Sequence, residues 1–213
     1  MDEIAPDAYR ALLADATVLE QDSHGAKVLL TAAGEIVKIF RQRRRLSGAS
    51  VYPYARRFAR NGERLHRLGI ATVRVNRLAR CRQPRRHLVW YKPLPGQTLR
   101  DFCAEHDVAA VAADLGRFVA MLHDNGVLFR SLHWGNIIIS ASGELGLIDI
   151  ADIRFYPWAL SFGARRRNFR HMLRYGEDRH HFAAAAAGFW PAYTAATAMA
   201  DDKCARLQQV VSP

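Results

Sequence analysis

The sequence predicts an α+β protein of two lobes, a small antiparallel β-sheet with one main helix followed by a reduced, mainly helical part. Three observations support this prediction. Short β-rich segments alternate with turn residues over the first part of the chain. The breaker Pro93-Leu94-Pro95-Gly96 then interrupts the pattern. Beyond it, apolar residues recur mainly at helical spacing. The lobes are therefore placed at residues 1–92 and 93–213.

The first lobe is expected to begin with a short amphipathic helix at residues 6–14. An antiparallel meander follows, with strands at residues 16–21, 27–31 and 35–40, and Ala33-Gly34 marks one turn. An arginine-rich loop over residues 41–45 leads to the main helix at residues 54–68. Extended segments at residues 72–78 and 87–92 complete this lobe.

The second lobe is expected to contain a core helix at residues 108–124, because Val111, Leu115, Phe118 and Leu122 share one face at helical spacing. A loop at residues 129–136 follows, and then a hairpin with strands at residues 137–139 and 145–148. From residue 156 on, the chain is expected to be helical. The alanine run 183–187 is interpreted as a helix-packing surface and Pro191 as a break.

The net charge restricts the class of partner. The chain has 31 Lys and Arg against 20 Asp and Glu, which gives 31 − 20 = +11, and its sequence pI is near 10.2. This balance favours anionic partners such as nucleotide, phospholipid, phosphorylated glycan or nucleic acid. Nucleic acid is disfavoured, because the arginines are spread over several segments without a recognition motif containing interleaved aromatic residues.

Cysteine usage and hydropathy predict a cytoplasmic protein. Cys81, Cys103 and Cys204 are widely separated and form no CxxC pair, so a reducing compartment fits best. The N-terminal residues lack the basic start and apolar stretch of a secretion signal. No apolar run approaches the ~20 residues needed to cross a bilayer.

The segment at residues 128–150 carries the strongest functional pattern. His133, Asn136 and Asp149 stand where a kinase-like catalytic loop has its organising His, its metal-binding Asn and its main metal-binding Asp. Ser131 stands where such a loop has its base Asp, five residues before the Asn. Either the substrate or a nearby acid such as Asp152 replaces the base, or the protein binds nucleotide without efficient transfer. The alternative is a polar hairpin with Asn136 as a turn residue and Asp149 as a cap.

Lys38 is the candidate phosphate-binding residue of the first lobe. It lies within an apolar strand, where a lysine is costly unless its ammonium meets an anion. The alternative is a lysine on an edge strand that reaches water. Gly25, in a turn with a single glycine, either lets backbone amides approach a phosphate or belongs to a plain β-turn. On the main helix, Asn61 is expected on the inward stripe in place of a kinase glutamate, with Glu63 in solvent.

The chain resembles the bacterial lipopolysaccharide core kinases, the relatives of 3-deoxy-D-manno-octulosonic acid kinase and heptose kinases that are often labelled toluene-tolerance proteins. The segments that carry this resemblance are Val37-Lys38-Ile39-Phe40, Tyr91-Lys92-Pro93-Leu94-Pro95-Gly96, Leu132-His133-Trp134-Gly135-Asn136 and Leu147-Ile148-Asp149. The resemblance implies a two-lobed protein-kinase-like fold and the cofactors ATP and Mg²⁺.

The resemblance also implies a role for each site residue. Lys38 and Gly25 would contact the phosphates of ATP, and Asn136 and Asp149 would bind Mg²⁺. The acceptor would be a sugar hydroxyl of the lipopolysaccharide inner core, presented by an anionic glycolipid or core precursor, with peripheral contact at the inner membrane. The alternative is a pseudokinase, a nucleotide-binding scaffold or regulator in envelope biogenesis, which Ser131 and Asn61 favour.

A basic segment after the hairpin is a second candidate site. Its members are Arg165, Arg166, Arg167, Arg170 and Arg174. On a helix they could present guanidinium groups to a phosphorylated sugar or an anionic headgroup, or form an ordinary solvated face. Nearby Tyr156 and Trp158 could stack on a sugar or lie at an interface, but core packing is the favoured role.

Overall fold

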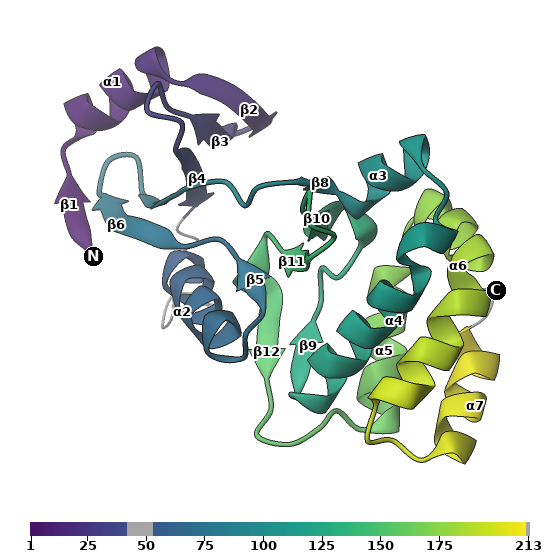
Figure 1. Cartoon of the computed structure of the whole chain (residues 1–213). Helices are drawn as coiled ribbons and strands as arrows, with labels where there is room; N and C mark the ends of the chain where they lie inside the picture. The colour runs from purple at the N-terminus through teal and green to yellow at the C-terminus, as the bar shows by residue number, and fades with distance from the viewer. Residues whose placement is uncertain (42–52, 212–213) are drawn as a thin grey trace. The chain divides into compact units, whose positions relative to one another are not determined.

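The chain divides into two compact units. In the computed structural model, which describes residues 1–41 and 53–211, the first unit is Met1–Arg67 with Thr72–Leu94, and the second is Leu68–Ala71 with Pro95–Pro213. Each unit is shown in Figure 1. The fold class is α+β, as the sequence predicts, with the sheet-rich unit first and the helix-rich unit second. The sequence placed the division after residue 92, and the units divide after Leu94.

The first unit is built on a six-stranded sheet with the order β1-β6-β7-β4-β3-β2. Its strands are β1 (Asp2–Ile4), β2 (Thr17–Asp22), β3 (Gly25–Leu30), β4 (Ile36–Arg41), β6 (Val75–Cys81) and β7 (Arg86–Tyr91). The antiparallel pairs of β2 with β3 and β3 with β4 confirm the predicted meander. Strands β4 and β7, and β6 and β7, are also antiparallel. Strand β1 pairs parallel to β6, and the sequence did not predict it.

One helix lies on each face of this sheet. Because side chains alternate across a strand, Val37 and Ile39 of β4 face a core that includes Tyr9 of α1 (Pro6–Asp15). Phe40 faces the opposite way and packs on Phe58 of α2 (Tyr54–Arg67), with 6.0 Å between ring centroids. Residues 42–52, which include three arginines of the predicted basic loop, lie outside the described part of the chain.

The second unit combines helices with short strands. Its helices are α3 (Leu99–Glu105), α4 (Ala109–Asp124), α5 (Phe162–Met172), α6 (Gly176–Ala196) and α7 (Asp201–Val211). Strands β5 (Ala71–Thr72), β11 (Leu145–Leu147), β10 (Ile137–Ile139) and β8 (Gln97–Thr98) form one sheet in that order. Strand β12 (Ile153–Phe155) pairs antiparallel with β9 (Val127–Phe129). No helix within residues 1–41 and 53–211 is long and apolar enough to cross a membrane.

Helices α4 and α6 pack side by side along the centre of the second unit (Figure 1). Gly116 permits their closest approach, because a Cβ atom there would lie 2.4 Å from the carbonyl oxygen of Phe189. The prediction of a break at Pro191 is wrong, since α6 continues through it. A proline inside a helix costs ~3 kcal/mol, and burial of the neighbouring Phe189, Trp190 and Tyr193 side chains offsets this cost.

The alanine run 183–187 is not the packing surface of α6. Ala185 is fully buried, but Ala183, Ala184 and Ala187 are exposed. The buried face instead has aromatic residues at helical spacing. They are Phe182, Phe189 and Tyr193. Larger side chains at these positions bury more apolar area than alanine and so dominate the packing.

A buried polar network joins α4, α5 and α6. Arg165 is 2% exposed; its guanidinium donates to Asp124 Oδ1 at 2.6 Å and to the Tyr193 hydroxyl at 2.8 Å. The Tyr193 hydroxyl lies 2.9 Å from Nδ1 of the fully buried His123. Burial, followed by the positive charge of Arg165, lowers the pKa of His123 to about 3. His123 is therefore neutral in the folded protein at physiological pH.

The pKa of His123 predicts a loss of stability in mild acid. An unfolded histidine has a pKa of about 6.5, so between pH 6.5 and the pKa of about 3 in the folded protein the unfolded chain binds the extra proton. Stability therefore falls as the pH falls through this window, by about 2 kcal/mol between pH 6.5 and pH 5. Urea unfolding of the wild type and of His123→Asn at pH 7 and pH 5 measures this difference. Equal pH dependence in the two proteins would contradict it.

Candidate active site

The hairpin of β10 and β11 brings Asn136 and Asp149 to the same end. Ile137 is paired with Leu147 in the antiparallel register. One step further, the amide of Ile148 donates to the carbonyl oxygen of Asn136 at 3.0 Å. Asn136 precedes β10 and Asp149 follows Ile148, so the two residues are neighbours across the hairpin although 13 positions separate them in the sequence.

Short hydrogen bonds close the loop from Ser131 to Asn136. The backbone amides of His133 and Asn136 donate to the carbonyl oxygens of Ser131 and His133, at 2.9 and 2.8 Å. The Nδ2 atom of Asn136 also donates to the Ser131 carbonyl oxygen at 2.9 Å. This bond fixes the orientation of the carboxamide, and within residues 1–41 and 53–211 no hydrogen bond occupies its Oδ1 atom. That oxygen is a suitable ligand for a hard cation.

Asp149 has an unusual backbone conformation. Its φ of 52° and ψ of 41° lie in the left-handed region, and it is the only non-glycine residue with positive φ in the described ranges 1–41 and 53–211. Such a conformation costs an ordinary residue ~1–2 kcal/mol and is concentrated at functional sites. Its side chain makes no cap hydrogen bond to the following 3₁₀ helix η3 (Ile150–Asp152). Asp149 therefore occupies the N-cap position of η3 without a side-chain cap bond to it, and its metal-binding role stays a prediction.

The loop is anchored by Asp178, which the sequence did not single out. Its fully buried carboxylate accepts two hydrogen bonds from Arg100 of α3, at 2.9 and 3.0 Å. It also accepts from the backbone amide of Trp134, at 3.3 Å, in the 3₁₀ helix η2 (Trp134–Asn136). A bidentate arginine pair holds a carboxylate in a defined orientation. Asp178 and Arg100 are therefore positioning residues for the loop.

His133 is held by packing. Its ring meets the Tyr175 ring edge-on, with 5.2 Å between centroids. Its Nδ1 atom is buried and has no hydrogen-bond partner within residues 1–41 and 53–211. Burial and the nearby Arg100 charge lower the pKa of His133, while Asp178 and Asp149 raise it. The charges that act on this ring show that Asp149 and Asp178 both lie near it.

Asp152 is the acid closest to Ser131 along the paired strands. Ile153 is paired with Phe129, and the amide of Arg130 reaches the carbonyl oxygen of Asp152 at 3.5 Å. Asp152 therefore lies opposite Arg130, one residue before Ser131. Both Ser131 and Asp152 are half-buried. Burial and the positive charge of Arg130 lower the pKa of His171. The negative charge of Asp152 raises it by a smaller amount.

In the first unit, Lys38 lies on an interior strand. Its partners across the sheet are Val28 of β3 and Val89 of β7, so the alternative of an edge-strand lysine is wrong. Lys38 is half-buried, and its Nζ lies 6.0 Å from the centroid of the Phe40 ring on the face that α2 covers. Asn61 of α2 is buried and Glu63 is exposed, as predicted for these two residues.

Gly25 occupies the turn between β2 and β3. Its φ of +108° is strained for any residue with a side chain, and no atom would lie within 4 Å of an added Cβ. Asp22 Oδ1 accepts from the backbone amide of His24 at 2.8 Å and stabilises the same turn. The geometry is that of a tight turn with an open approach to the backbone.

Two predictions about the basic segment are corrected. Arg165 does not face solvent, because its guanidinium is buried against Asp124 and Tyr193. Trp158 does not pack in the core, because it is 68% exposed. A helix turns by about 100° per residue, so Arg165 points inward while Arg166 and Arg167 lie on other faces of α5.

The metal-ligating side chains are few. Within residues 1–41 and 53–211, no group of three or more His, Cys, Asp or Glu is placed to hold an ion. A Mg²⁺ ion usually keeps several waters and takes one or two protein ligands together with substrate phosphates. Asn136 and Asp149 have side-chain oxygens of the kind that such an ion takes, and their role as its ligands stays a prediction.

The matches of this chain to known proteins come from solved structures. No protein-family model matches the chain. No curated protein sequence matches it. Two solved structures of the bifunctional kinase-methyltransferase WbdD match 87% of this chain, one at 16% identity with a TM-score of 0.49 and one at 15% identity with a TM-score of 0.45. The chain spans about half the length of the matched chains, 47% and 48%.

Proposed function

We propose that this protein is an ATP-dependent phosphotransferase that phosphorylates a sugar hydroxyl of the lipopolysaccharide inner core. The observation that carries the proposal is that Asn136 and Asp149 lie at the same end of the β10–β11 hairpin, where Asn136 faces Ile148. The resemblance of the sequence to lipopolysaccharide core kinases supports the choice of acceptor. The acceptor would reach the enzyme as an anionic glycolipid or core precursor at the inner membrane, and the net charge of +11 suits such a partner.

Each site residue has a distinct proposed role. Asn136 and Asp149 hold Mg²⁺, which when bound neutralises negative charge on the ATP phosphates. Lys38 contacts the phosphates from the interior strand β4, and Gly25 lets the backbone of the β2–β3 turn approach them. His133 supports the loop by packing on Tyr175. Positioning and charge neutralisation supply most of the rate in phosphoryl transfer, so this set can act without a strong base.

Asp152 is the proposed substitute for the missing base. Ser131 cannot act as a strong base near neutral pH, because its hydroxyl is not ionised. The support for Asp152 is that its backbone lies opposite Arg130, the residue before Ser131. A carboxylate at this position could accept the proton of the acceptor hydroxyl, directly or through one water molecule.

The second candidate function is a pseudokinase, a nucleotide-binding scaffold or regulator in envelope biogenesis. Ser131 and the buried Asn61 favour it, because both replace acids of an active kinase. Incubation with γ-labelled ATP, Mg²⁺ and core oligosaccharide fractions separates the two functions. Label in the glycan supports the phosphotransferase. Binding of ATP with no label in any fraction supports the pseudokinase.

Replacement of Ser131 by aspartate is expected to raise transfer. A general base contributes ~10²–10⁴ in rate, and Ser131→Asp would restore it next to a loop whose hydrogen bonds use only the backbone of residue 131. We expect an increase of at least ~10-fold in label transfer, as a fraction of that range. Ser131→Asn is the matched control of similar size and no charge. A loss of transfer in Ser131→Asp with full ATP binding would show that Ser131 has a role of its own.

A further inference from the structure

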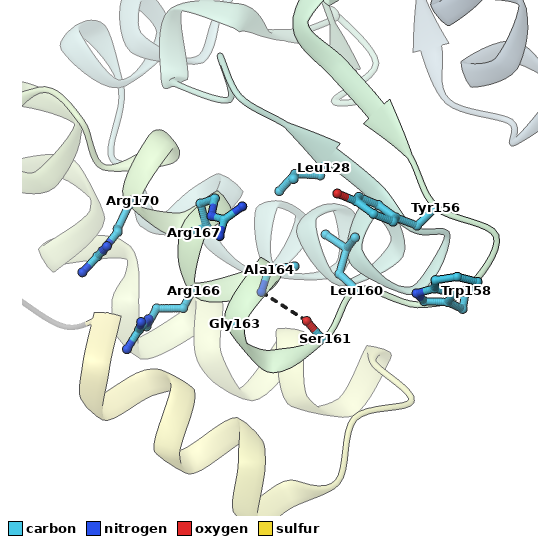
Figure 2. A pocket seen from close by; sticks show the side chains of 10 residues that line it. All are labelled: Leu128, Tyr156, Trp158, Leu160, Ser161, Gly163, Ala164, Arg166, Arg167 and Arg170. Carbon is cyan, nitrogen blue, oxygen red and sulfur yellow. Dashed lines mark hydrogen bonds between the residues drawn. The ribbon is translucent and has the colours of Figure 1, made fainter.

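The second unit contains a hollow that the proposed phosphate-transfer residues do not line. It has a volume of about 390 Å³ and lies between the end of β12 and the first turns of α5. Its lining includes Leu128, Tyr156, Trp158, Leu160 and the arginines 166, 167 and 170. Figure 2 shows Tyr156 and Arg167 on opposite sides of it, with Leu128 and Leu160 between them. The volume is in the range of small-molecule sites, ~300–1,000 Å³.

This hollow carries a concentrated positive charge. Helix α5 has Arg165, Arg166, Arg167 and Arg170 and no acidic residue. Arg165 is neutralised by Asp124, but within residues 1–41 and 53–211 none of the other three forms an ion pair. Arg166 and Arg170 are four positions apart on the same helix face, a spacing at which like charges repel. An anion at this face would relieve the repulsion.

An aromatic surface accompanies this charge. Trp158 is 68% exposed at the edge of the hollow, although the tryptophans at positions 90, 134 and 190 are 7%, 0% and 3% exposed. Tyr156, directly after β12, directs its hydroxyl into the hollow (Figure 2). An exposed indole face stacks on the apolar face of a sugar ring, while a phenol hydroxyl can donate to a ring oxygen or hydroxyl.

We propose that this hollow is a binding site for a phosphorylated sugar, with the ring on Trp158 and the phosphate at Arg167. Arginine is suited to phosphate because its planar fork donates two parallel hydrogen bonds. Arg166 and Arg170 add charge at the rim. The concave shape favours a sugar ring over the flat surface of a bilayer.

This site goes beyond the phosphate-transfer site. The lining of the hollow contains none of the residues proposed to bind ATP or Mg²⁺ or to replace the base, which are Gly25, Lys38, Asn136, Asp149 and Asp152. Binding to the hollow can therefore be measured without nucleotide or turnover. The phosphorylated sugar can be a free metabolite or the headgroup of a glycolipid, since both present the same chemistry to Trp158 and Arg167.

Acrylamide quenching of tryptophan fluorescence tests the proposal. Trp158 is the one exposed tryptophan of the four in the chain, so it dominates quenching. We expect glucose 1-phosphate to protect it in a saturable way, and glucose or inorganic phosphate alone to bind more weakly. Arg167→Gln should weaken binding about tenfold, the loss expected for one charge-assisted contact. Arg85→Gln, an equal charge change at an exposed arginine of the first unit, should leave binding unchanged.

A second arm distinguishes the sources of the ligand. Vesicles of phosphatidylcholine with phosphatidylinositol 4-phosphate present a phosphorylated ring on a lipid, and vesicles with phosphatidylglycerol present charge without a ring. Protection by the first vesicles beyond that by glucose 1-phosphate supports a glycolipid source, and equal protection supports a free sugar phosphate. Protection by phosphatidylglycerol vesicles but not by glucose 1-phosphate would overturn the proposal in favour of a membrane surface. Equal binding by wild type and Arg167→Gln would also overturn it.

Discussion

Asp149→Ala is expected to remove Mg²⁺-dependent stabilisation by ATP and to reduce phosphate transfer by at least ~10³-fold. A ligand at 100 times its Kd stabilises a protein by ~2.7 kcal/mol, which raises the Tm of a chain of this size by roughly 5–10 °C. The variant would lose this shift, because Asn136 alone provides too few ligands for the ion. Alanine is less well tolerated than aspartate in the left-handed conformation of residue 149, so the variant is also expected to be less stable without ligand, and its ATP shift is measured from its own ligand-free Tm.

Thermal denaturation with ATP and Mg²⁺, with ATP and EDTA, and without ligand measures this loss. Asp15→Ala is the matched control, because Asp15 is an exposed aspartate at the end of α1 in the first unit. Lys38→Met is the companion variant and should lose part of the ATP shift even with EDTA, since it acts on phosphate and not on the metal. An unchanged Mg²⁺-dependent shift in Asp149→Ala would remove Asp149 from the metal site.

The hairpin and the helix faces were predictable because local patterns determine them. Three isoleucines, a turn with Gly143 and the Leu145-Gly146-Leu147 segment are enough to specify β10 and β11. The inward position of Asn61 follows from the helical spacing of its apolar neighbours. The elements that can be predicted from the sequence are therefore those in which apolar periodicity and turn chemistry indicate the same structure.

The anchors of the site were not predictable because they depend on contacts distant in sequence. Asp178 accepts a hydrogen bond from the backbone amide of Trp134, which lies 44 positions earlier in the sequence. No local sequence pattern identifies Asp178 as the acceptor. Within the Arg165-Arg166-Arg167 run, composition cannot tell which residue is buried, since the choice depends on where Asp124 and Tyr193 lie. Strand β1 is three residues long and forms by pairing with β6. In each case tertiary contacts decide what the sequence leaves open.

The burial of Arg165 gives the second large prediction, a loss of about 3–5 kcal/mol of stability in Arg165→Met. Four hydrogen bonds leave its guanidinium, to Leu160 O at 2.9 Å, the Tyr193 hydroxyl at 2.8 Å, Thr197 Oγ1 at 2.7 Å and Asp124 Oδ1 at 2.6 Å. Methionine fills the volume of the stem but leaves the Asp124 carboxylate without its cation. Arg166→Met, at the next and exposed position, should change stability by less than ~0.5 kcal/mol.

A double-mutant cycle separates the lost charge pair from lost packing. Asp124 also accepts from Thr197 Oγ1 at 2.9 Å and from the backbone amide of Ala198 at 2.8 Å. Thr197 donates to Oδ1 and the Ala198 amide to Oδ2, so Asp124→Asn removes the charge and keeps an acceptor for one of these two groups. If the uncompensated carboxylate causes the loss in Arg165→Met, adding Asp124→Asn should recover about 1–3 kcal/mol of it in urea unfolding. Additive losses would mean that Arg165 stabilises the second unit by packing and hydrogen bonds to α6, with little contribution from its pairing with Asp124.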